Sequence, residues 1–455
     1  MTNSVSLFQK DIITYIVSEF LYFKDDCVQN ILLCNKHFNV TPYKYNFISN
    51  QNIKLEQLEK IDNENIDCFM FDVFELSQDL PKTNLLKKIN FSHLITDFNF
   101  NEPLQEYFDM NKTTVEKIQF GKKYNQFLPK NLPQTLQHIV FGFYYNRILV
   151  SDLPKSLKTM IFGWKYNQSL PDDLPDSVEM IEFQDHYNKI LPDKLPKKLN
   201  HIKFGWEYNQ PLPETISCLL KDITFGWKYD HPLPENLPKT IENMHFSCNF
   251  NHPFPENLPS SLRSICFDYY SKYNHPLPSN LPKSLETIEF GNHYNQPLPQ
   301  NLPISLKYIE FNTSYNQPLP KKLPSNLETI KFGADYNQPL PAHLPNSIKH
   351  ITFGKNYNQL LPDHLPQLLK EITFFYDCEF DHYLPENLPS SLEKISFYGE
   401  SFFKKPLPKN LPISLKQIII NSKHMKQILG TQYKILNGFL HKNQTNTFIK
   451  IKLND

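Results

Sequence analysis

Three histidines recur at nearly constant spacing and are the residues of this 455-residue sequence most suggestive of metal chemistry. His231, His252 and His275 would fall on successive turns of a repeating structure, close enough to share an ion. Other copies of the same stretch carry a glutamine at this position, such as Gln168 and Gln296. Substitution at a polar surface position is the favoured interpretation, and we expect no metal site.

Acidic side chains offer a second possible chemistry, the cleavage of carbohydrate. Glu182, Glu289 and Glu310 share one repeat position on a predicted strand, where a carbohydrate-cleaving β-helix would place its carboxylates. Lys203 and Lys331 occupy that position in other copies, as on an ordinary charged surface. The sequence contains no G-x-S-x-G, glycine-rich phosphate loop, C-x-x-C or H-E-x-x-H motif. We therefore expect no enzymatic activity and no cofactor.

The composition restricts the classes of partner that the protein is expected to bind and the compartment in which it is expected to occur. The 47 basic residues balance 47 acidic ones, so the long-range field that gathers nucleic acid is missing. Asp11 and Glu19 interrupt the apolar stretch at the start of the chain, which fits neither a signal peptide nor a membrane span. The seven cysteines are odd in number and scattered, unlike a secreted disulfide framework. We expect a cytoplasmic protein with reduced thiols that binds neither nucleic acid nor membranes.

A repeat of about 21 residues organises most of the chain. Tyrosines that precede a recurrent asparagine or aspartate stand 21 residues apart at Tyr124, Tyr145, Tyr166, Tyr187, Tyr208 and Tyr229. After a two-residue insertion the same step resumes at Tyr273, Tyr294, Tyr315, Tyr336 and Tyr357. A phenylalanine closes the pattern L-x-x-I-x-F in fourteen successive units, from Phe120 to Phe397. The pattern extends the array outward to about seventeen units through Ile66, Phe69, Phe71, Leu86, Ile89, Phe91, Leu415, Ile418 and Ile420.

Each unit predicts one short strand and one extended return limb. Isoleucine and phenylalanine two residues apart lie on the same face of a strand, so each strand is half-buried. A glycine follows the phenylalanine in eight of the fourteen units, and we expect it to supply the positive φ of a sharp turn. The prolines of LPxxLP exclude a helix, and its leucines should point inward. Stacking such units buries a continuous core, which predicts a mainly β protein with a parallel β-solenoid.

An asparagine follows the recurrent aromatic residue from Asn125 to Asn358, with Asp230 as the exception. An amide can both donate to and accept from the backbone of a neighbouring turn. We therefore expect an inward-facing amide ladder with a structural role.

The segment YNQPLPxNLPxSLxxIxFG occurs nearly verbatim at residues 294–312 and 315–333. It resembles the FNIP repeat, a family grouped with leucine-rich repeats and common in social amoebae and in giant DNA viruses of amoebae. The resemblance implies a leucine-rich-repeat-like solenoid over residues 85–420. Residues 51–84 would form a junction with a weak first repeat, and residues 421–455 a C-terminal cap.

Residues 1–50 lack the repeat and show helical periodicity that fits three short helices, the last beginning at Thr41–Pro42. LFQKDIITYIVSEFLYFKDDCVQNILLCNKHFN resembles an F-box, although Phe8 replaces the usual proline. The resemblance implies that this module binds a Skp-family adaptor and that the repeats present a target protein to a cullin-RING ubiquitin ligase. It assigns the adaptor-binding face to Leu7, Phe8, Ile12, Ile16, Leu32 and Phe38. The alternative is a plain helical cap for the solenoid.

A binding surface must differ from repeat to repeat while the core residues stay the same. Two positions of the repeat vary in this way: the one just after Phe-Gly and the one between the isoleucine and the phenylalanine. All three tryptophans share the column just after Phe-Gly, where Lys and Asp also occur, and aromatic side chains with a charged rim are typical contact anchors. The alternative is that these rings only cover their own solenoid. From both columns we take as partner-binding candidates Phe143, Trp164, Trp206, Trp227, Glu182 and Lys203.

The sequence therefore predicts a protein-interaction protein, monomeric outside its complex. The first hypothesis is a substrate-recognition subunit of an SCF-type ubiquitin ligase, which binds a Skp-family adaptor and an unknown target. If the protein is viral, it would act in the host cytoplasm. The second hypothesis is a repeat scaffold that binds host or partner proteins without ligase involvement.

Overall fold

The computed structural model describes residues 45–49, 66–77, 82, 86, 89–214, 216, 219–375, 377–398, 402–421, 433–436, 439–442 and 445–454. The six residues predicted to bind the adaptor lie outside this part of the chain. Two compact units, Met1–Met180 and Ile181–Asp455, make up the chain. No helix among the described residues is long and apolar enough to cross a membrane.

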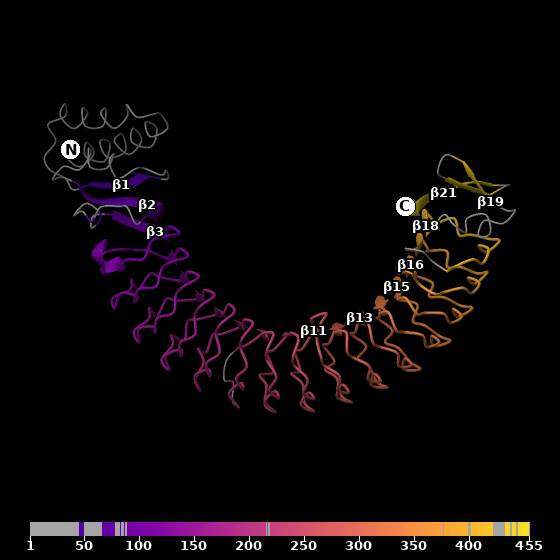
Figure 1. Cartoon of the computed structure of the whole chain (residues 1–455), viewed down its shortest axis with the longest axis horizontal. Helices are drawn as coiled ribbons and strands as arrows, with labels where there is room; N and C mark the ends of the chain where they lie inside the picture. Colours follow the sequence, from indigo (N-terminus) through magenta and orange to yellow (C-terminus); the bar gives the residue numbers. More distant parts are fainter. Residues whose placement is uncertain are drawn as a thin grey trace, which may run out of the picture. The chain divides into compact units, whose positions relative to one another are not determined.

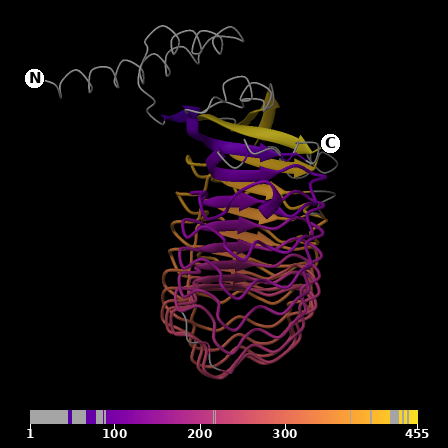
Figure 2. The ribbon, with the colours of Figure 1, turned by 90° about the vertical axis from the view of Figure 1, so that its left-hand side faces the viewer.

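In the described part of the first unit the strands run parallel, one per turn (Figure 1). They are β1 (Tyr45–Ser49), β2 (Ile66–Leu76), β3 (Ile89–Thr96), β4 (Lys117–Gln119), β5 (His138–Val140) and β6 (Thr159–Ile161). Each pairs in parallel with the next, and Figure 2 shows these indigo and purple strands in a stack. A 3₁₀ turn, η2 (Leu104–Glu106), lies between β3 and β4. Strand β1 occupies the place of the expected third helix, because its backbone pairs with β2.

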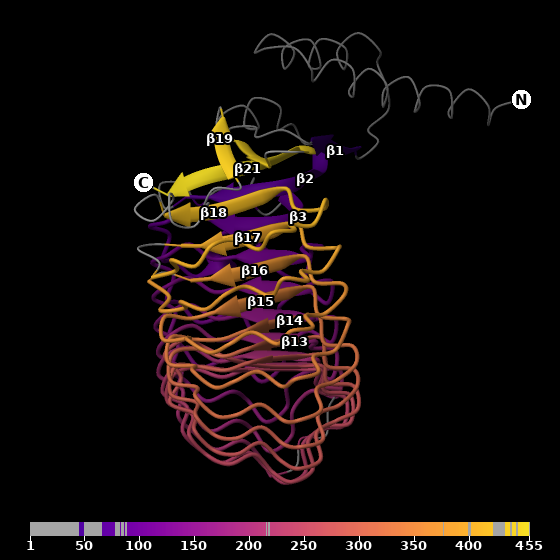
Figure 3. The same cartoon turned by 90° about the vertical axis from the view of Figure 1, so that its right-hand side faces the viewer.

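The second unit repeats the same arrangement. Its parallel strands are β8 (His201–Lys203), β9 (Asp222–Thr224), β10 (Asn243–Phe246), β11 (Ser264–Phe267), β12 (Thr287–Glu289), β13 (Tyr308–Glu310), β14 (Thr329–Lys331), β15 (His350–Phe353), β16 (Glu371–Phe374), β17 (Lys394–Phe397) and β18 (Gln417–Asn421). Strand β7 (Met180–Glu182) contains the boundary between the units. Figure 3 shows β13 to β18 pointing the same way. The predicted parallel β-solenoid is confirmed.

A hairpin ends the described chain. Strands β19 (Tyr433–Leu436) and β20 (Phe439–Lys442) pair in antiparallel fashion, and β20 pairs likewise with β21 (Thr445–Asn454). Strand β21 also runs parallel to β18. The last repeat strand therefore has a hydrogen-bonded neighbour on its outer side, which protects its backbone groups from pairing with another chain.

The core consists of columns of like side chains, one from most turns. Ile288 and Phe290 are fully buried, as the alternation of the strand predicts, and the return-limb leucines such as Leu298 also point inward. The tyrosines stack face to face, with ring centroids 6.0 Å apart for Tyr294 and Tyr315. Each phenylalanine also stacks on the tyrosine of its own turn, at 3.7 Å for Phe290 and Tyr294. Neighbouring turns supply most of the apolar contacts of each turn, as in other solenoids.

The register of the first repeats differs from the prediction. Leu94 of β3, rather than Ile89, pairs with Ile118, so Thr96 stands where later turns carry phenylalanine. The shift by five residues places Phe100 under Tyr124, with ring centroids 6.1 Å apart and an angle of 2°. The hydroxyl of Thr96 accepts a hydrogen bond from the N–H of Gly121 at 2.7 Å, so this polar residue is satisfied at the end of the strand.

The glycines after the phenylalanines have a role other than the predicted one. Their backbone stays outside the left-handed region. Instead, the preceding turn approaches so closely that a Cβ on Gly226 would lie 1.8 Å from the carbonyl oxygen of Gly205. Glycine is thus needed for close approach of two backbones, and a positive φ is not involved.

The asparagine ladder exists but lies at the edge of the solenoid. The Oδ1 of Asn316 accepts hydrogen bonds from the N–H of Asn337 at 2.9 Å and from Nε2 of Gln338 at 3.2 Å. These asparagines are half-buried or, like Asn146, exposed, so the predicted inward orientation is wrong. The ladder joins the loops that follow the strands, and we assign it a structural role.

Candidate interaction surface

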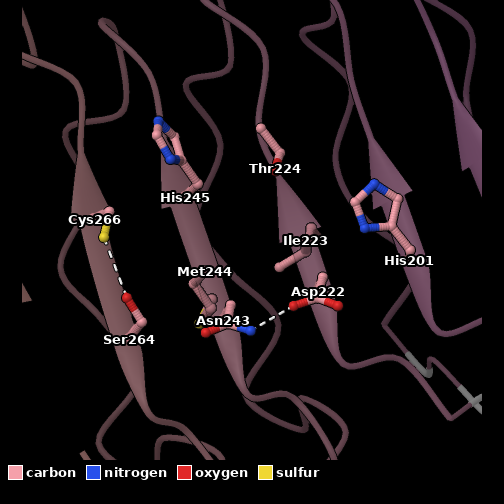
Figure 4. A pocket seen from close by; sticks show the side chains of 9 residues that line it. All are labelled: His201, Asp222, Ile223, Thr224, Asn243, Met244, His245, Ser264 and Cys266. Carbon is pink, nitrogen blue, oxygen red and sulfur yellow. Dashed lines mark hydrogen bonds between the residues drawn. The ribbon is translucent and has the colours of Figure 1, made fainter. Parts of the chain in front are cut away.

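The strand face of β8 to β11 carries a shallow cup of about 420 Å³ (Figure 4). Side chains that alternate with the buried isoleucines and phenylalanines point outward here, because successive residues of a strand face opposite sides. Ile223 and Met244, from the inward-facing rows, complete the lining. The residues that line the cup are His201, Asp222, Ile223, Thr224, Asn243, Met244, His245, Ser264 and Cys266.

Two side-chain hydrogen bonds join neighbouring turns at the cup. Nδ2 of Asn243 donates to Oδ1 of Asp222 at 2.5 Å (Figure 4). His245 Nε2 lies 2.7 Å from Oδ1 of Asp268, and this hydrogen bond lowers the pKa of the Asp268 carboxyl. Asp268, which follows β11 outside the lining, therefore stays ionised at neutral pH, and the cup itself combines the Asp222 carboxylate with hydrogen-bond donors.

Cys266 is the one nucleophilic thiol in the cup, and its surroundings do not activate it. Burial raises the pKa of this thiol, so at neutral pH it is protonated. Its Sγ lies 3.2 Å from the hydroxyl of Ser264. This thiol is therefore not activated as a nucleophile.

Aromatic rings form a rim beside the cup, in the loops that follow β8, β9 and β11. Trp206 and Trp227 stack with ring centroids 4.4 Å apart and an interplanar angle of 2°. Tyr270 continues this row at 6.3 Å from Trp227. Trp206 remains 45% exposed and Tyr270 60% exposed. We call Trp206, Trp227, Tyr269 and Tyr270 the aromatic rim.

The first unit has a smaller aromatic row at the same repeat position. Phe143 and Trp164 stack at 5.5 Å, and Nζ of Lys122 lies 5.0 Å from the centroid of Phe143. The same ammonium lies 5.2 Å from the ring of Phe98, which is 55% exposed. The Lys122 ammonium therefore stabilises this row through cation–π contacts with both rings while it remains in contact with water.

The structure brings some of the predicted contact residues together and adds others. Glu182 Oε1 lies 3.6 Å from Nε2 of His201, at the border of the cup. Lys203 is exposed on β8. Sequence reasoning missed Tyr269 and Tyr270, which enter the rim because the two-residue insertion after Phe267 lengthens their loop. In the sequence, this insertion is the feature that indicates a loop different from those of the other turns.

The three recurrent histidines bond the preceding turn from the position of the glutamines, most of which donate to an asparagine Oδ1 there rather than to a backbone carbonyl. Nε2 of His231, His252 and His275 bonds a backbone carbonyl of the preceding turn at 3.3, 3.1 and 3.0 Å, respectively. Nε2 of Gln126 donates to the carbonyl of Asn101 in the same way. Within the described part of the chain, no three metal-ligating side chains gather in one place. The positions support the interpretation as polar surface substitutions.

Comparison with known protein families identifies the repeat. The FNIP Repeat family model matches overlapping segments that together cover residues 145–206 and 250–377, so the chain contains FNIP repeats. No curated protein gives a significant match. The crystal structure of CroV588, described as a novel circular leucine-rich-repeat protein, is 26% identical with a TM-score of 0.61 over 86% of this chain and 68% of that one.

Two further solved structures are less similar. YopM from Yersinia enterocolitica is 20% identical over 67% of this chain and 68% of that chain, with a TM-score of 0.42. A chain of the Toll–Spätzle complex of Drosophila is 13% identical over 84% of this chain and 58% of that chain, with a TM-score of 0.46. The likeness to the CroV588 structure shows that the solenoid is of the leucine-rich-repeat type.

Proposed function

We propose that this FNIP-repeat protein binds a target protein through the cup on β8 to β11 and the aromatic rim beside it. The observation that carries the proposal is the stacked pair Trp206 and Trp227, in which Trp206 is 45% exposed and Trp227 is half-buried. Tryptophan and tyrosine dominate binding energy in protein interfaces, where a partner removes their remaining exposed surface from water.

The packing of the core does not require tryptophan at positions 206 and 227. Phe204 and Tyr208, which flank Trp206 in the sequence, are buried and complete the core columns of that turn. Most other turns carry a small or polar residue at the tryptophan position, such as Asn292, Thr313 or Ala334, and keep the same core. The tryptophans therefore add contact area at the surface of an already complete turn.

We further propose that the protein is the substrate-recognition subunit of an SCF-type ubiquitin ligase in the cytoplasm, monomeric outside the complex. The resemblance of residues 1–50 to an F-box, followed by a repeat array, supports this proposal. A Skp-family adaptor would bind the first module, and the cup and aromatic rim would bind the target. The alternative is a repeat scaffold that binds its partner without ligase involvement.

The target-binding proposal is tested with the full chain as bait in an affinity pull-down from host cells, followed by mass spectrometry. The double variant Trp206→Ala, Trp227→Ala should lose the target while its melting temperature stays nearly unchanged. Phe402→Ala, which removes an aromatic ring that is 50% exposed in another turn, is the matched control and should keep the target. Equal loss of stability and binding in the double variant would favour a packing role for the tryptophans.

The ligase proposal has a separate test. A purified Skp-family adaptor should co-purify with the intact chain, and Ile12→Asp combined with Ile16→Asp should abolish this. Deletion of residues 1–50 should leave target binding intact. If the intact chain binds its target but not the adaptor, the ligase proposal is refuted and the scaffold function is favoured.

A further inference from the structure

An apolar column runs along the return limbs of the second unit, away from the strand face. It occupies the position three residues after the stacked aromatic residue of each turn. Every member of this column is exposed. We call it the return-limb ridge, and in the second unit it consists of Ile190, Pro211, Pro232, Pro253, Pro276, Pro297, Pro318, Pro339, Leu360, Tyr383 and Pro406.

Backbone geometry alone does not explain the ridge. Proline fixes φ and suits an extended limb, but a purely local role would allow any residue where proline is absent. The three positions of the second unit without proline instead carry Ile190, Leu360 and Tyr383. Their side chains are 66%, 67% and 62% exposed. Apolar character is thus kept at a water-facing position, which marks an interaction surface.

Three successive turns combine the ridge with negative charge. Glu214, Glu235 and Glu256 each follow a ridge proline by three residues, and all three are exposed. None of them takes part in an ion pair with another described residue. Lys239 is the only basic residue on the limbs 211–218, 232–239 and 253–260, so this part of the ridge carries net negative charge.

The spacing of the turns matches an α-helix laid across them. Tyr208, Tyr229 and Phe250, three residues before the ridge prolines, have ring centroids 6.1 Å apart from turn to turn. Four residues of an α-helix rise about 6 Å, so apolar side chains at i, i+4 and i+8 would each meet one turn. Basic side chains along one flank of that helix would reach the row of glutamates.

We propose that Pro211, Pro232 and Pro253, together with Glu214, Glu235 and Glu256, bind a basic amphipathic helix of a partner protein. The site is distinct from the cup and the aromatic rim, and it does not depend on the proposed function. The prolines would cover the apolar stripe of the helix, and the glutamates would pair with its lysine or arginine side chains. Because the charged pairs are exposed, binding should weaken as salt increases.

The probe is a fluorescent 18-residue peptide with leucine at i, i+4, i+8 and i+12, lysine along one flank of that stripe, and alanine or glutamine elsewhere. Its binding to the full chain is followed by fluorescence anisotropy at low and high salt. A second peptide carries glutamate in place of each lysine. The lysine peptide should bind, with weaker affinity at high salt, and the glutamate peptide should not.

Variants locate the binding site. Glu235→Gln with Glu256→Gln should weaken binding about five- to tenfold, as expected for the loss of two exposed ion pairs. Asp363→Asn with Glu386→Gln removes the same charge from the same column elsewhere and should change the affinity less than twofold. Pro232→Ser with Pro253→Ser should also weaken binding, and serine is tolerated in this column, as at Ser169. The proposal is refuted if the lysine peptide does not bind, if both peptides bind equally, or if the control variant loses as much affinity.

Discussion

Phe290 lies in the middle of the phenylalanine column and tests whether that column holds the solenoid together. Its side chain is fully buried. The ring stacks on Tyr294 at 3.7 Å within its own turn. It also stacks on Phe311 at 5.4 Å and Phe267 at 6.3 Å in the neighbouring turns. Phe290→Ala would remove one ring from contacts that join three turns.

The expected loss follows from the area that the ring buries. A phenylalanine buries about 150–250 Å². At about 25 cal/mol per Å² this corresponds to roughly 4–6 kcal/mol, part of which alanine retains. The cavity left behind adds to the loss, since stacked neighbours on both sides limit collapse. We therefore expect Phe290→Ala to lower the free energy of unfolding by about 3–5 kcal/mol.

Urea unfolding of the full chain, followed by circular dichroism, measures the effect. Phe402→Ala is the matched control, because that ring is 50% exposed, and it should cost less than about 1 kcal/mol. Hydrogen exchange should become faster in β11, β12 and β13 before it does in β17, since each turn is stabilised mainly by its neighbours. An unchanged unfolding midpoint for Phe290→Ala, or an equal loss in the control, would refute the assignment of the column to the core.

Three further changes test other parts of the frame. Gly226→Ala should destabilise the protein by about 2 kcal/mol or more, because the new Cβ overlaps the carbonyl of Gly205; a neutral change in thermal melting would contradict the close approach. Asn316→Ala should cost about 1 kcal/mol by removing the acceptor for the N–H of Asn337, whereas Asn316→Asp should cost less in the same measurement, since Asp230 already fills this role. Burial raises the pKa of the stacked tyrosines such as Tyr294, so the folded state keeps them protonated, and their contribution to stability is complete below about pH 10 and falls at higher pH. An unfolding midpoint that stays constant from about pH 8 to pH 12 would argue against this burial.

The candidate site was only partly predictable from sequence. The shared repeat position of Trp206 and Trp227 identified the aromatic column, because one strict period brings residues 21 apart into adjacent turns. Tyr269 and Tyr270 escaped notice because they belong to a longer loop that the repeat pattern does not define. The cup likewise depends on side chains from four strands, and no single strand indicates it.

The sequence by itself determined the repeat, the parallel solenoid, and the buried columns of leucine, isoleucine, phenylalanine and tyrosine. Periodicity is sufficient for these, since most units bury the same face against a neighbour with the same pattern of apolar residues. The tertiary structure decided the register of β3, the reason for glycine at Gly226, and the position of the asparagine ladder at the edge of the solenoid. Each of these depends on the distance between two backbones, and that distance is fixed only when successive turns pack together.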